Sequence, residues 1–423
     1  MTRAFYALFL LLAPTYAFAY LDPGTGSLLL YAIFGMAMTA AFALRNLWYA
    51  ARSRISLRGA ARRGAKGNAL PDVVFQSEGG RYWQVFKPVV DALARAGVRC
   101  AYVTPDPADP ALSLELPGFS PLRPGGEMAT IAWMNAVSCP LVVSTTPHLD
   151  VYQLRRSRSV KHYAHLFHAP TDVCFYEKYA FDWYDTLLTV GPFQEASVRA
   201  LERLRGTREK TLLPTGCTYF DYMLAERADG APPEEDIVLY APAWGMRSSV
   251  VTHGTGIIDA LADAGQRVIF RPHPQFYVSH RALIADIERR YRDSPLVEID
   301  RNRTGNQSMA RSRAMVTDLS GVLFDYACLH GKPIVLANAD IDPAGQEGED
   351  LPRPLWDAAA SVELAFARVG DDPSEVVPAC EAARGARAAY ADRAKDFRDR
   401  SFFHFGQAGE AAARNIVDIL GRI

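Results

Sequence analysis

Residues Ala314–Leu336 read AMVTDLSGVLFDYACLHGKPIVL, and this stretch decides the fold class of the chain. Ala314–Thr317 has the character of a short buried strand, Val322–His330 that of a short helix, and Pro333–Leu336 that of a second strand. A strand, a helix and a further strand in this order form a βαβ unit, in which the two strands run parallel. The sequence therefore predicts an α/β fold around this segment.

The same alternation of short strands and helices extends from this segment toward both ends of the chain. Further strands are predicted at Asp72–Gln76, Val98–Thr104, Leu141–Thr145, Thr186–Val190, Thr211–Pro214, Ile237–Tyr240, Arg267–Phe270 and Leu296–Ile299. Trp83–Ala96 is predicted as a helix that ends at Gly97, residues 105–126 as loops, and the stretch from Val376 onward as helical. Repeated alternation of this kind is typical of parallel sheets covered by helices.

One break interrupts the alternation. Glu226–Asp236 contains Gly230 and the pair Pro232-Pro233 and has no apolar period, so it is the predicted domain boundary. We predict two Rossmann-like domains, residues 70–225 and 237–423, with the site in the cleft between them. A length of 423 residues suits two domains with an additional segment.

The additional segment lies at the N-terminus. Leu28–Leu44 is apolar all round, and its 17 residues would span ~25 Å as a helix. The basic residues that follow it, with no acidic residue before Asp72, are Arg45, Arg52, Arg54, Arg58, Arg62, Arg63 and Lys66. A basic block directly after a span marks the cytoplasmic side. We therefore predict that residues 20–66 form a transmembrane anchor and basic juxtamembrane segment. The alternative is a buried core helix, which the lack of acidic counter-charges disfavours.

Residues 1–19 have two interpretations. Ala4–Ala19 is apolar, follows Arg3, and ends in Ala17-Phe18-Ala19, a pattern that suits signal-peptidase cleavage. The segment is therefore signal-like, or it is the first arm of a membrane hairpin. Both alternatives place residues 45–423 in the cytoplasm. The predicted location is the inner (cytoplasmic) membrane, with the catalytic domains facing the cytoplasm.

Charge and cysteine usage exclude several classes of protein. The formal net charge is −1, which gives no general reason to expect nucleic-acid binding. The six cysteines include no Cys-x-x-Cys pair and no Cys/His spacing typical of zinc. Neither a disulfide framework nor a structural zinc site is indicated.

Three motifs follow predicted strands of the second domain, where open α/β sheets bind ligands. Tyr240-Ala241-Pro242-Ala243-Trp244 follows one strand, and Arg271-Pro272-His273-Pro274 follows another. Thr317-Asp318-Leu319-Ser320-Gly321 joins a strand to a helix whose free N–H groups and dipole favour an anion. Taken alone, Ser320 is better interpreted as a plain helix cap, which needs no ligand. The candidate donor- and phosphate-binding residues are Arg271, Asp318, Ser320, Gly321, Tyr240, Pro242 and Trp244.

The two candidate catalytic residues are histidines, one in each domain. Arg271 and His273 alternate with Pro272 and Pro274 on a rigid turn, where they suit charge stabilisation at a pyrophosphate. Lys161–Pro170 contains three histidines, in a predicted strand that runs into a loop. No carboxylate or cysteine pattern completes a metal site there, so no metal is predicted. His168 is interpreted as a general base and the other two histidines as structural.

These segments, taken in order, resemble a known family. Phe167-His168-Ala169-Pro170, the two motifs that begin at Tyr240 and Arg271, and Thr317–Pro333 resemble the ordered motifs of the CDP-glycerol glycerophosphotransferases. A fifth segment, Gly216–Asp221, resembles the Gly-x-Pro-Arg-x-Asp segment of that family. The family includes the primases and polymerases of teichoic-acid synthesis, and the resemblance covers about residues 160–337.

The resemblance implies a GT-B fold and a transfer that needs neither metal nor cofactor. His168 and His273 would correspond to the histidines of the family's Trp-His-Gly and Arg-x-His-Pro motifs. The chain departs from the family at Phe167 and Ala169, at Gly321, and in Cys217–Phe220, which lacks the Pro-Arg pair. These departures bear on which alditol and which acceptor the enzyme uses more than on the class of reaction.

The predicted function is therefore transfer of glycerol phosphate, or a related alditol phosphate such as ribitol phosphate, from a CDP-alditol to a hydroxyl of a polysaccharide or lipid-linked acceptor at the membrane. His168 would deprotonate the acceptor hydroxyl, and CMP would leave. Two alternatives remain from the sequence alone. One is a GT-B glycosyltransferase that uses a nucleotide sugar. The other is a non-catalytic membrane scaffold of polysaccharide export.

Overall fold

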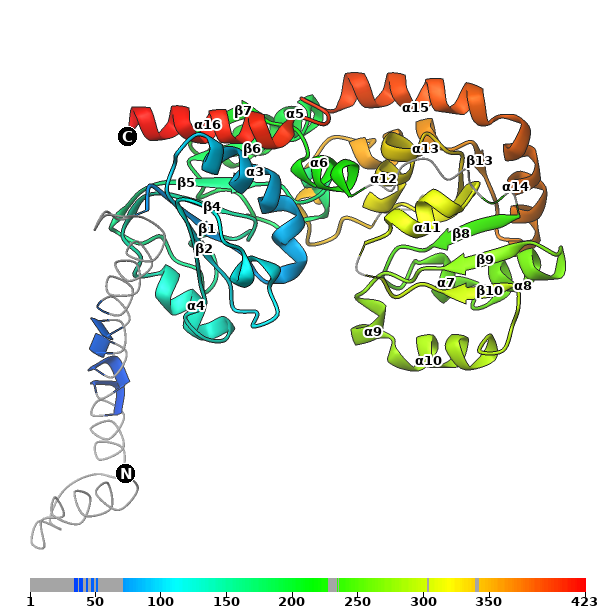
Figure 1. The fold of residues 1–423 in the computed structure, drawn as a ribbon, viewed down its shortest axis with the longest axis horizontal. Helices are drawn as coiled ribbons and strands as arrows, with labels where there is room; N and C mark the ends of the chain where they lie inside the picture. The colour runs from blue at the N-terminus through cyan, green and yellow to red at the C-terminus, as the bar shows by residue number, and fades with distance from the viewer. Residues whose placement is uncertain are drawn as a thin grey trace, which may run out of the picture. The chain divides into compact units, whose positions relative to one another are not determined.

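The computed structural model describes residues 71–226, 234, 236–302, 304–338 and 342–423, together with helical residues 34–36, 38–40, 43–44, 47–48 and 51 (Figure 1). The chain divides into two compact units, Met1–Arg52 and Ser53–Ile423, and the second unit contains both sheets. The predicted signal-like segment 1–19 and most of the predicted anchor 20–66 lie outside the described residues. No helix in the described part is long and apolar enough to cross a membrane.

The first sheet has seven parallel strands in the order β3-β2-β1-β4-β5-β6-β7. Their bounds are β1 Val73–Gln76, β2 Cys100–Val103, β3 Phe119–Leu122, β4 Cys139–Ser144, β5 Val160–Leu166, β6 Thr186–Thr189 and β7 Thr211–Pro214. The α-helices associated with it are α3 Trp83–Arg95, α4 Glu127–Met134, α5 Pro192–Arg205 and α6 Thr218–Ala225. The 3₁₀ turns are η1 Gly80–Tyr82, η2 Pro110–Ser113 and η3 Val173–Phe175.

The second sheet has six parallel strands in the order β10-β9-β8-β11-β12-β13. Their bounds are β8 Ile237–Ala241, β9 Arg267–Phe270, β10 Val297–Ile299, β11 Ala314–Asp318, β12 Ile334–Asn338 and β13 Ala367–Arg368. The helices up to residue 375 are α7 Ser249–Thr252, α8 Gly256–Asp263, α9 Phe276–Ser279, α10 Arg281–Arg290, α11 Asn306–Arg311, α12 Gly321–His330 and α13 Trp356–Leu364, with 3₁₀ turns η4 Glu347–Glu349 and η5 Pro373–Glu375. The chain ends in α14 Val376–Gly385, α15 Arg387–Ser401 and α16 Ala408–Arg422.

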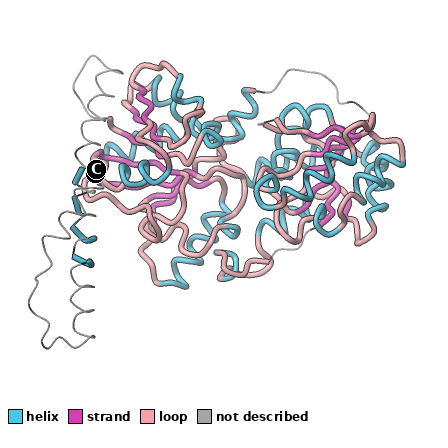
Figure 2. Tube along the Cα trace, turned by 90° about the horizontal axis from the view of Figure 1, so that it is seen from below, coloured by secondary structure: helices cyan, strands magenta, loops and turns pink. Residues whose placement is uncertain are grey.

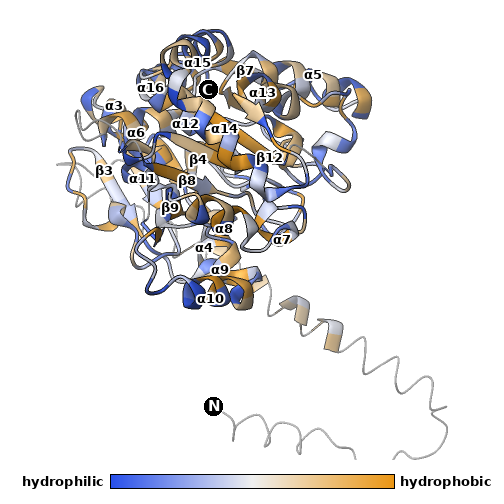
Figure 3. Cartoon of the chain, turned by 90° about the vertical axis from the view of Figure 1, so that its right-hand side faces the viewer, coloured by the Kyte–Doolittle hydropathy of each residue, from blue (hydrophilic) through white to orange (hydrophobic). Residues whose placement is uncertain are grey.

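Burial explains why the strands read as nearly continuous apolar runs. Every residue of β1, β2, β6, β8 and β11 is buried, as expected for parallel sheets that helices cover on both faces. Figure 2 shows the strands as two groups with helices around them, and Figure 3 shows β4 and β12 in hydrophobic colours, while the outer helix α10 is largely hydrophilic. The predicted α/β fold with two parallel sheets is therefore confirmed.

The order of the strands indicates where each sheet is expected to bind a ligand. In the first sheet, strand order reverses between β1 and β4, and in the second between β8 and β11. Ligands of open α/β sheets bind outside the carboxyl ends of the strands at such a switch point. The loops after β1 and β4, and those after β8 and β11, are therefore the places to search for sites.

The C-terminal helices connect the two sheets. Figure 1 shows α15 beside the second sheet and α16 over the first, where α16 packs against α3 and α6. Gly409 allows the close approach, because a Cβ there would lie 2.7 Å from Cβ of Pro88. The backbone N–H of Gly409 also donates to Asp221 Oδ2 at 2.7 Å. The sequence analysis assigned all terminal helices to the second domain, residues 237–423, whereas in the structure α16 packs against helices associated with the first sheet.

Two edge strands were missed by the sequence interpretation. β3 lies inside residues 105–126, which were predicted as loops, and β13 has two residues. Both are short, and Pro121 within β3 lacks a backbone N–H, so neither has the apolar period of a central strand. The predicted strands Thr211–Pro214 and Arg267–Phe270 match β7 and β9 residue for residue.

Candidate functional site

A cavity of about 740 Å³ lies at the β8/β11 switch point of the second sheet. Its walls come from the loops after β8, β9 and β11 on one side and from His168–Thr171, Phe175 and Tyr219 on the other. The cavity is therefore shared by both halves of the unit. The predicted site residues that line it are His168, Pro242, Trp244, Arg271, His273, Asp318, Ser320 and Gly321.

Helix α12 begins at this cavity. Ser320 occupies the cap position with extended backbone, φ −154° and ψ 152°, and its side chain makes no capping hydrogen bond within the described part of the chain. The first N–H groups of a helix have no partner inside the helix. The interpretation of Ser320 as a plain cap therefore finds no support, and the hydroxyl and the helix N-terminus both face a space where an anion is favoured.

Asp318, the last residue of β11, holds the loop that follows β8. Its Oδ2 accepts hydrogen bonds from the backbone N–H of Ala243 at 3.0 Å, from Oγ of Ser248 at 3.2 Å and from the backbone N–H of Ser249 at 3.0 Å. Burial raises the pKa of this carboxyl, and these hydrogen bonds oppose the rise. The Asp318 side chain therefore stabilises the loop that forms the cavity wall and does not bind a phosphate directly.

Tyr240 was predicted as a donor-binding residue, and its side chain does not reach the site. The ring is fully buried and packs against Phe270, with the centroids 5.5 Å apart. Its Oη shares a hydrogen bond of 2.8 Å with Oγ of Ser249. Because Tyr240 lies inside β8, its side chain faces the core, and the residues of its motif that line the cavity begin with Ala241, the last residue of the strand.

Arg271 and His273 follow β9 as predicted. Nη1 of Arg271 donates to Oδ2 of Asp300 at 2.7 Å and to the carbonyl of Asn302 at 3.0 Å, which fixes the guanidinium at the cavity wall. Nδ1 of His273 accepts a hydrogen bond from the backbone N–H of Gln275 at 3.1 Å. An accepting Nδ1 places the proton of the neutral imidazole on Nε2, which makes Nε2 a donor for a phosphate oxygen.

Burial lowers the pKa of His273 to about 4, and the positive charges of Arg81 and Arg271 lower it further. The imidazole is therefore neutral near pH 7 before an anion binds. Its ring lies beside that of Trp244, with centroids 6.2 Å apart and planes at 31°, and Trp244 is 58% exposed. An exposed indole at the rim of a cavity offers a flat surface for a planar base.

His168 lies just after β5, in the wall that the first half contributes. Its Nδ1 is 3.3 Å from Oη of Tyr176, and its ring meets that of Tyr82 edge-on at 5.2 Å. Burial lowers the pKa of His168 to about 4, and the charge of Arg81 lowers it further. The imidazole is therefore uncharged at neutral pH and able to accept a proton.

The two neighbouring histidines have other surroundings. His165 is fully buried among the rings of Phe167, Phe181 and Tyr184, with centroid distances of 4.8–5.1 Å. Nε2 of His162 lies 2.8 Å from Oγ1 of Thr186. Neither histidine lines the cavity, which agrees with the structural role predicted for both.

Asp325 and Tyr219 are among the residues that line the cavity and that the sequence interpretation did not assign to the site. Asp325 is 7% exposed, and its Oδ1 has no hydrogen-bond partner among the described residues. Burial raises the pKa of Asp325 to about 7 although the charge of Arg271 opposes the rise. Both residues belong to motifs that the sequence singled out, 317–326 and 216–221, so the signal was present without an assigned role.

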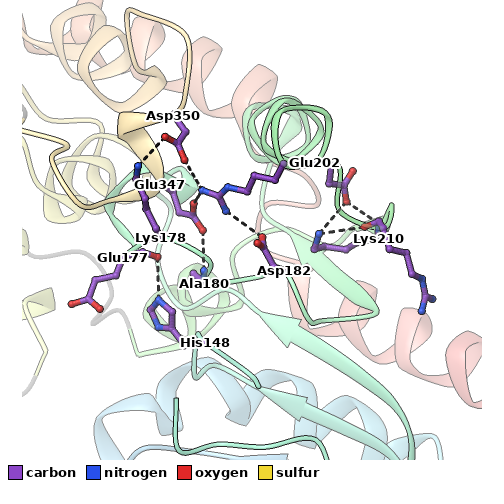
Figure 4. A network of polar contacts seen from close by, with 11 residues as sticks. His148, Glu177, Lys178, Ala180, Asp182, Glu202, Lys210, Glu347 and Asp350 are labelled. Carbon is purple, nitrogen blue, oxygen red and sulfur yellow. Dashed lines mark hydrogen bonds and ion pairs between the residues drawn. The ribbon is translucent and has the colours of Figure 1, made fainter. Parts of the chain in front are cut away.

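Polar contacts fix the two walls relative to one another. Lys178 Nζ donates to Oδ1 of Asp350 at 2.9 Å, and Oε1 of Glu347 accepts from the backbone N–H of Ala180 at 2.9 Å (Figure 4). Farther along, the backbone N–H of Asp172 donates to the carboxylate of Asp357 on α13 at 3.1 Å. These contacts join the segment after His168 to the segment around η4 and α13.

Comparisons with known proteins agree with this geometry. The family model described as CDP-Glycerol:Poly(glycerophosphate) glycerophosphotransferase matches residues 133–419. Among curated proteins, none matches the sequence. Among solved structures, the wall teichoic acid polymerase TagF is similar at a TM-score of 0.58 and 15% identity, over 90% of this chain and 97% of that one.

Two further solved structures are also similar. A TagF variant soaked with CDPG gives a TM-score of 0.57 at 15% identity, over the same shares of the two chains. A UDP-GlcNAc 2-epimerase from Methanocaldococcus jannaschii, in complex with UDP-GlcNAc and UDP, gives 0.53 at 14% identity, over 83% of this chain and 99% of that one. These similarities show a GT-B-like fold. Because the family model covers more than half of the sequence, the chain belongs to the CDP-glycerol:poly(glycerophosphate) glycerophosphotransferase family of enzymes.

Proposed function

We propose that this enzyme transfers glycerol phosphate from CDP-glycerol to a hydroxyl group of a cell-surface glycan or its lipid-linked precursor, with release of CMP. One observation carries the proposal: a single cavity brings together the N-terminus of α12, Arg271, and two histidines from opposite walls. That set combines a site for a pyrophosphate with a site for a base, as attack of a hydroxyl on a phosphorus requires.

The donor lies on the wall formed by the second sheet. Its pyrophosphate is placed at Ser320 and Gly321, where the free N–H groups of α12 favour negative charge. Arg271 adds a fixed positive charge, and Nε2 of His273 donates a hydrogen bond to a phosphate oxygen. As the bond to CMP breaks, these groups stabilise the charge that develops on the leaving group.

The acceptor hydroxyl approaches from the wall formed by the first sheet. In the tautomer with the proton on Nδ1, His168 donates from Nδ1 to Oη of Tyr176, and Nε2 is left to accept the hydroxyl proton. The acceptor oxygen forms a bond to the β-phosphorus, the bond from that phosphorus to the oxygen of CMP breaks, and a phosphodiester results. No metal ion is required, because α12, Arg271 and His273 supply the electrostatic stabilisation.

We further propose that Leu28–Leu44 anchors the enzyme in the cytoplasmic membrane, with residues 45–423 in the cytoplasm, where CDP-linked donors are made. Exposed apolar side chains on the helical residues of this region support the anchor: Phe34, Met36, Leu44, Leu47 and Trp48 are each 54–69% exposed. A cytoplasmic reporter fused after Ile423 should be active. Activity of a periplasmic reporter at the same position would contradict this orientation.

The test of the reaction is a product assay on the purified full chain. With CDP-glycerol, CDP-ribitol and a UDP-sugar offered separately, we expect CMP release from a CDP-alditol and no UDP release from the sugar nucleotide. UDP release alone would replace the proposal with a glycosyltransferase. Absence of both products, together with no donor binding in a calorimetric titration, would identify a non-catalytic scaffold.

A further inference from the structure

A second cavity, of about 660 Å³, lies at the β1/β4 switch point of the first sheet. Its lining comes from Gln76–Arg81 at the end of β1 and after it, from Pro105-Asp106 after β2, from the start of α4, and from Thr146–His148 and Tyr152–Leu154 after β4. The first sheet thus presents a cavity at the same topological position as the one that the second sheet contributes to the site described above. The carboxyl ends of its strands are where a ligand of this sheet is expected.

The second cavity adjoins the reaction centre through η1. Arg81 lines the second cavity, and its neighbour Tyr82 contacts the ring of His168 at 5.2 Å. From the lining of the second cavity, the charge of Arg81 also lowers the pKa of both His168 and His273 in the first. A molecule held in the second cavity therefore has a short path to the proposed base.

The lining suits a polyhydroxylated, uncharged ligand. Tyr152 is 55% exposed at the rim, and its ring lies 4.8 Å from that of His148, so the two form an aromatic surface against which the C–H face of a sugar ring packs. Oγ1 of Thr146 is buried and has no hydrogen-bond partner in the described part of the chain. Such a group calls for a hydrogen-bonding ligand or solvent.

The charges of the described lining residues disfavour a polyanion. They comprise the three acidic side chains of Glu78, Asp106 and Glu127 and the single guanidinium of Arg81. Glu78 already pairs with Arg81 at 3.5 Å, and Asp106 accepts from the backbone N–H of Gly80 at 3.0 Å. A cleft of net negative charge repels a chain of phosphodiesters and admits a neutral one.

The cavity wall is held in place before any ligand binds. His148 has a left-handed backbone with φ 63°, an uncommon conformation for a residue other than glycine. Its backbone N–H donates to the carbonyl of Ala180 at 2.8 Å, and Nε2 lies 3.1 Å from the carbonyl of Glu177 (Figure 4). Because Glu177 is bridged to Gln346, which lines the first cavity, the two cavities share a fixed wall.

We infer that this second cavity is the acceptor subsite, and that it takes the uncharged sugar end of a glycan rather than the end of a poly(glycerol phosphate) chain. The inference rests on the proposed function for its chemistry, since the bound sugar supplies the hydroxyl that His168 deprotonates. It identifies the enzyme as one that adds glycerol phosphate to a neutral glycan instead of extending a phosphodiester polymer.

The experiment uses the purified full chain, CDP-glycerol, and two acceptor probes: an octyl glycoside of an uncharged disaccharide and a three-unit oligo(glycerol phosphate). We expect CMP release with the glycoside at a KM at least tenfold below that for the oligo(glycerol phosphate). Tyr152→Ala should raise the KM for the glycoside about tenfold and leave the KM for CDP-glycerol unchanged. Glu127→Lys replaces a negative with a positive charge in the lining, so it should lower the KM for the oligo(glycerol phosphate) relative to the KM for the glycoside.

Trp183→Ala is the matched control, because Trp183 is also 55% exposed but lines neither cavity. Saturation-transfer NMR with the glycoside and CDP provides a measurement independent of turnover. Preference for the oligo(glycerol phosphate), or a Tyr152→Ala variant that binds the glycoside as well as Trp183→Ala does, would overturn the inference. If the glycoside binds as expected but no CDP-alditol is turned over, the subsite stands and the proposed function fails.

Discussion

Nδ1 of His168 lies 3.3 Å from Oη of Tyr176, and this contact orients the imidazole at the boundary between the two halves of the site. Burial raises the pKa of the Tyr176 hydroxyl far above its usual range, so the phenol is protonated at neutral pH. A phenol whose Oη accepts from Nδ1–H leaves Nε2 of His168 unprotonated. Tyr176 is therefore a positioning residue for the proposed base.

Tyr176→Phe should lower kcat about 3- to 10-fold, the amount expected when one hydrogen bond of ~0.5–1.5 kcal/mol is lost from the arrangement that supports the reaction. The KM for CDP-glycerol should not change, because Tyr176 does not line the donor side. Steady-state kinetics with each substrate varied in turn measures both values. An increase in the donor KM with unchanged kcat would assign Tyr176 to donor binding instead.

Substitution of His168 and of His273 should have different effects on turnover and on donor binding. His168→Ala should lower turnover by about 10²–10⁴ and leave CDP-glycerol binding nearly intact, because His168 is in the wall opposite the proposed donor site. His273→Ala should lower turnover and also weaken donor binding, since Nε2 is aimed at the pyrophosphate. Calorimetric titration of CDP-glycerol beside a CMP-release assay tests both variants. Near-normal turnover in His168→Ala would refute its role as base.

The pH profile depends on the lowered pKa values. A histidine that acts as a base loses activity when it is protonated, so the acidic limb of kcat/KM reports its pKa in the free enzyme. Burial lowers the pKa of His168 to about 4, so activity should persist well below pH 6.5 and fall only as the pH approaches 4.

This profile is measured from pH 4 to 9 on the wild type and on Asp325→Asn. An acidic limb near pH 7 that disappears in Asp325→Asn would show that Asp325, whose pKa is raised to about 7, controls the rate instead.

Local patterns in the sequence predicted most of the strands of both sheets. Eight of the nine candidate site residues also line the main cavity. Strands and the residues that follow them can be predicted in this way because they depend on short-range features of the sequence. A strand of a parallel sheet reads as a short apolar run, and a site residue follows its carboxyl end. The sequence placed the Tyr240 side chain at the cavity, whereas the structure places it in the core. An aromatic residue inside a strand cannot be distinguished in sequence from one just after the strand. Its burial depends on α7, which places Ser249 against its hydroxyl.

Long-range packing explains what the sequence could not supply. Gly216, within the family-like segment 216–221, has φ +91° and no room for a Cβ beside the carbonyl of Phe403. The backbone N–H of Phe403 donates to the carbonyl of Val190 at 2.9 Å. The C-terminal segment thus packs against the first half of the unit through residues that lie about 190–210 positions earlier in the chain. No period or spacing in the sequence predicts that contact. The second cavity was missed for the same reason, since four loops build it.

Ser320→Asp tests whether a phosphate of the donor binds at the start of α12 or whether Ser320 only occupies the cap position of that helix. The Ser320 side chain makes no capping hydrogen bond in the described part of the chain, and aspartate is itself a favoured residue at the cap position, so the fold should survive. A negative charge at the start of α12 reverses a helix-terminus interaction of about 0.3–2 kcal/mol and adds direct repulsion, so CDP-glycerol affinity should fall about tenfold or more. Ser320→Ala is the control, and a smaller loss is expected because it introduces no charge. Equal affinities in both folded variants would exclude a phosphate at this helix start.

An ion-pair cluster around Arg205 connects α5 to η4. The side chain of Arg205 is 9% exposed and pairs with Glu347, which is fully buried, with Asp182 at 3.2 Å and with Asp350 at 3.0 Å. Removal of the guanidinium leaves the Glu347 carboxylate buried without its cation, and burial already raises the pKa of Glu347. Breaking a buried ion pair in this way costs about 3–5 kcal/mol.

Arg400→Ala is the matched control, because Arg400 pairs with Glu363 where both side chains are about half exposed. Pairs at the surface contribute about 0–1 kcal/mol. Urea denaturation should therefore show a large loss of stability in Arg205→Ala and almost none in Arg400→Ala. The loss should shrink at low pH, since a protonated Glu347 no longer needs its partner and the raised pKa brings that protonation within reach. Equal unfolding midpoints for the two variants near pH 7 would show that the Arg205 contacts do not hold the walls of the site together.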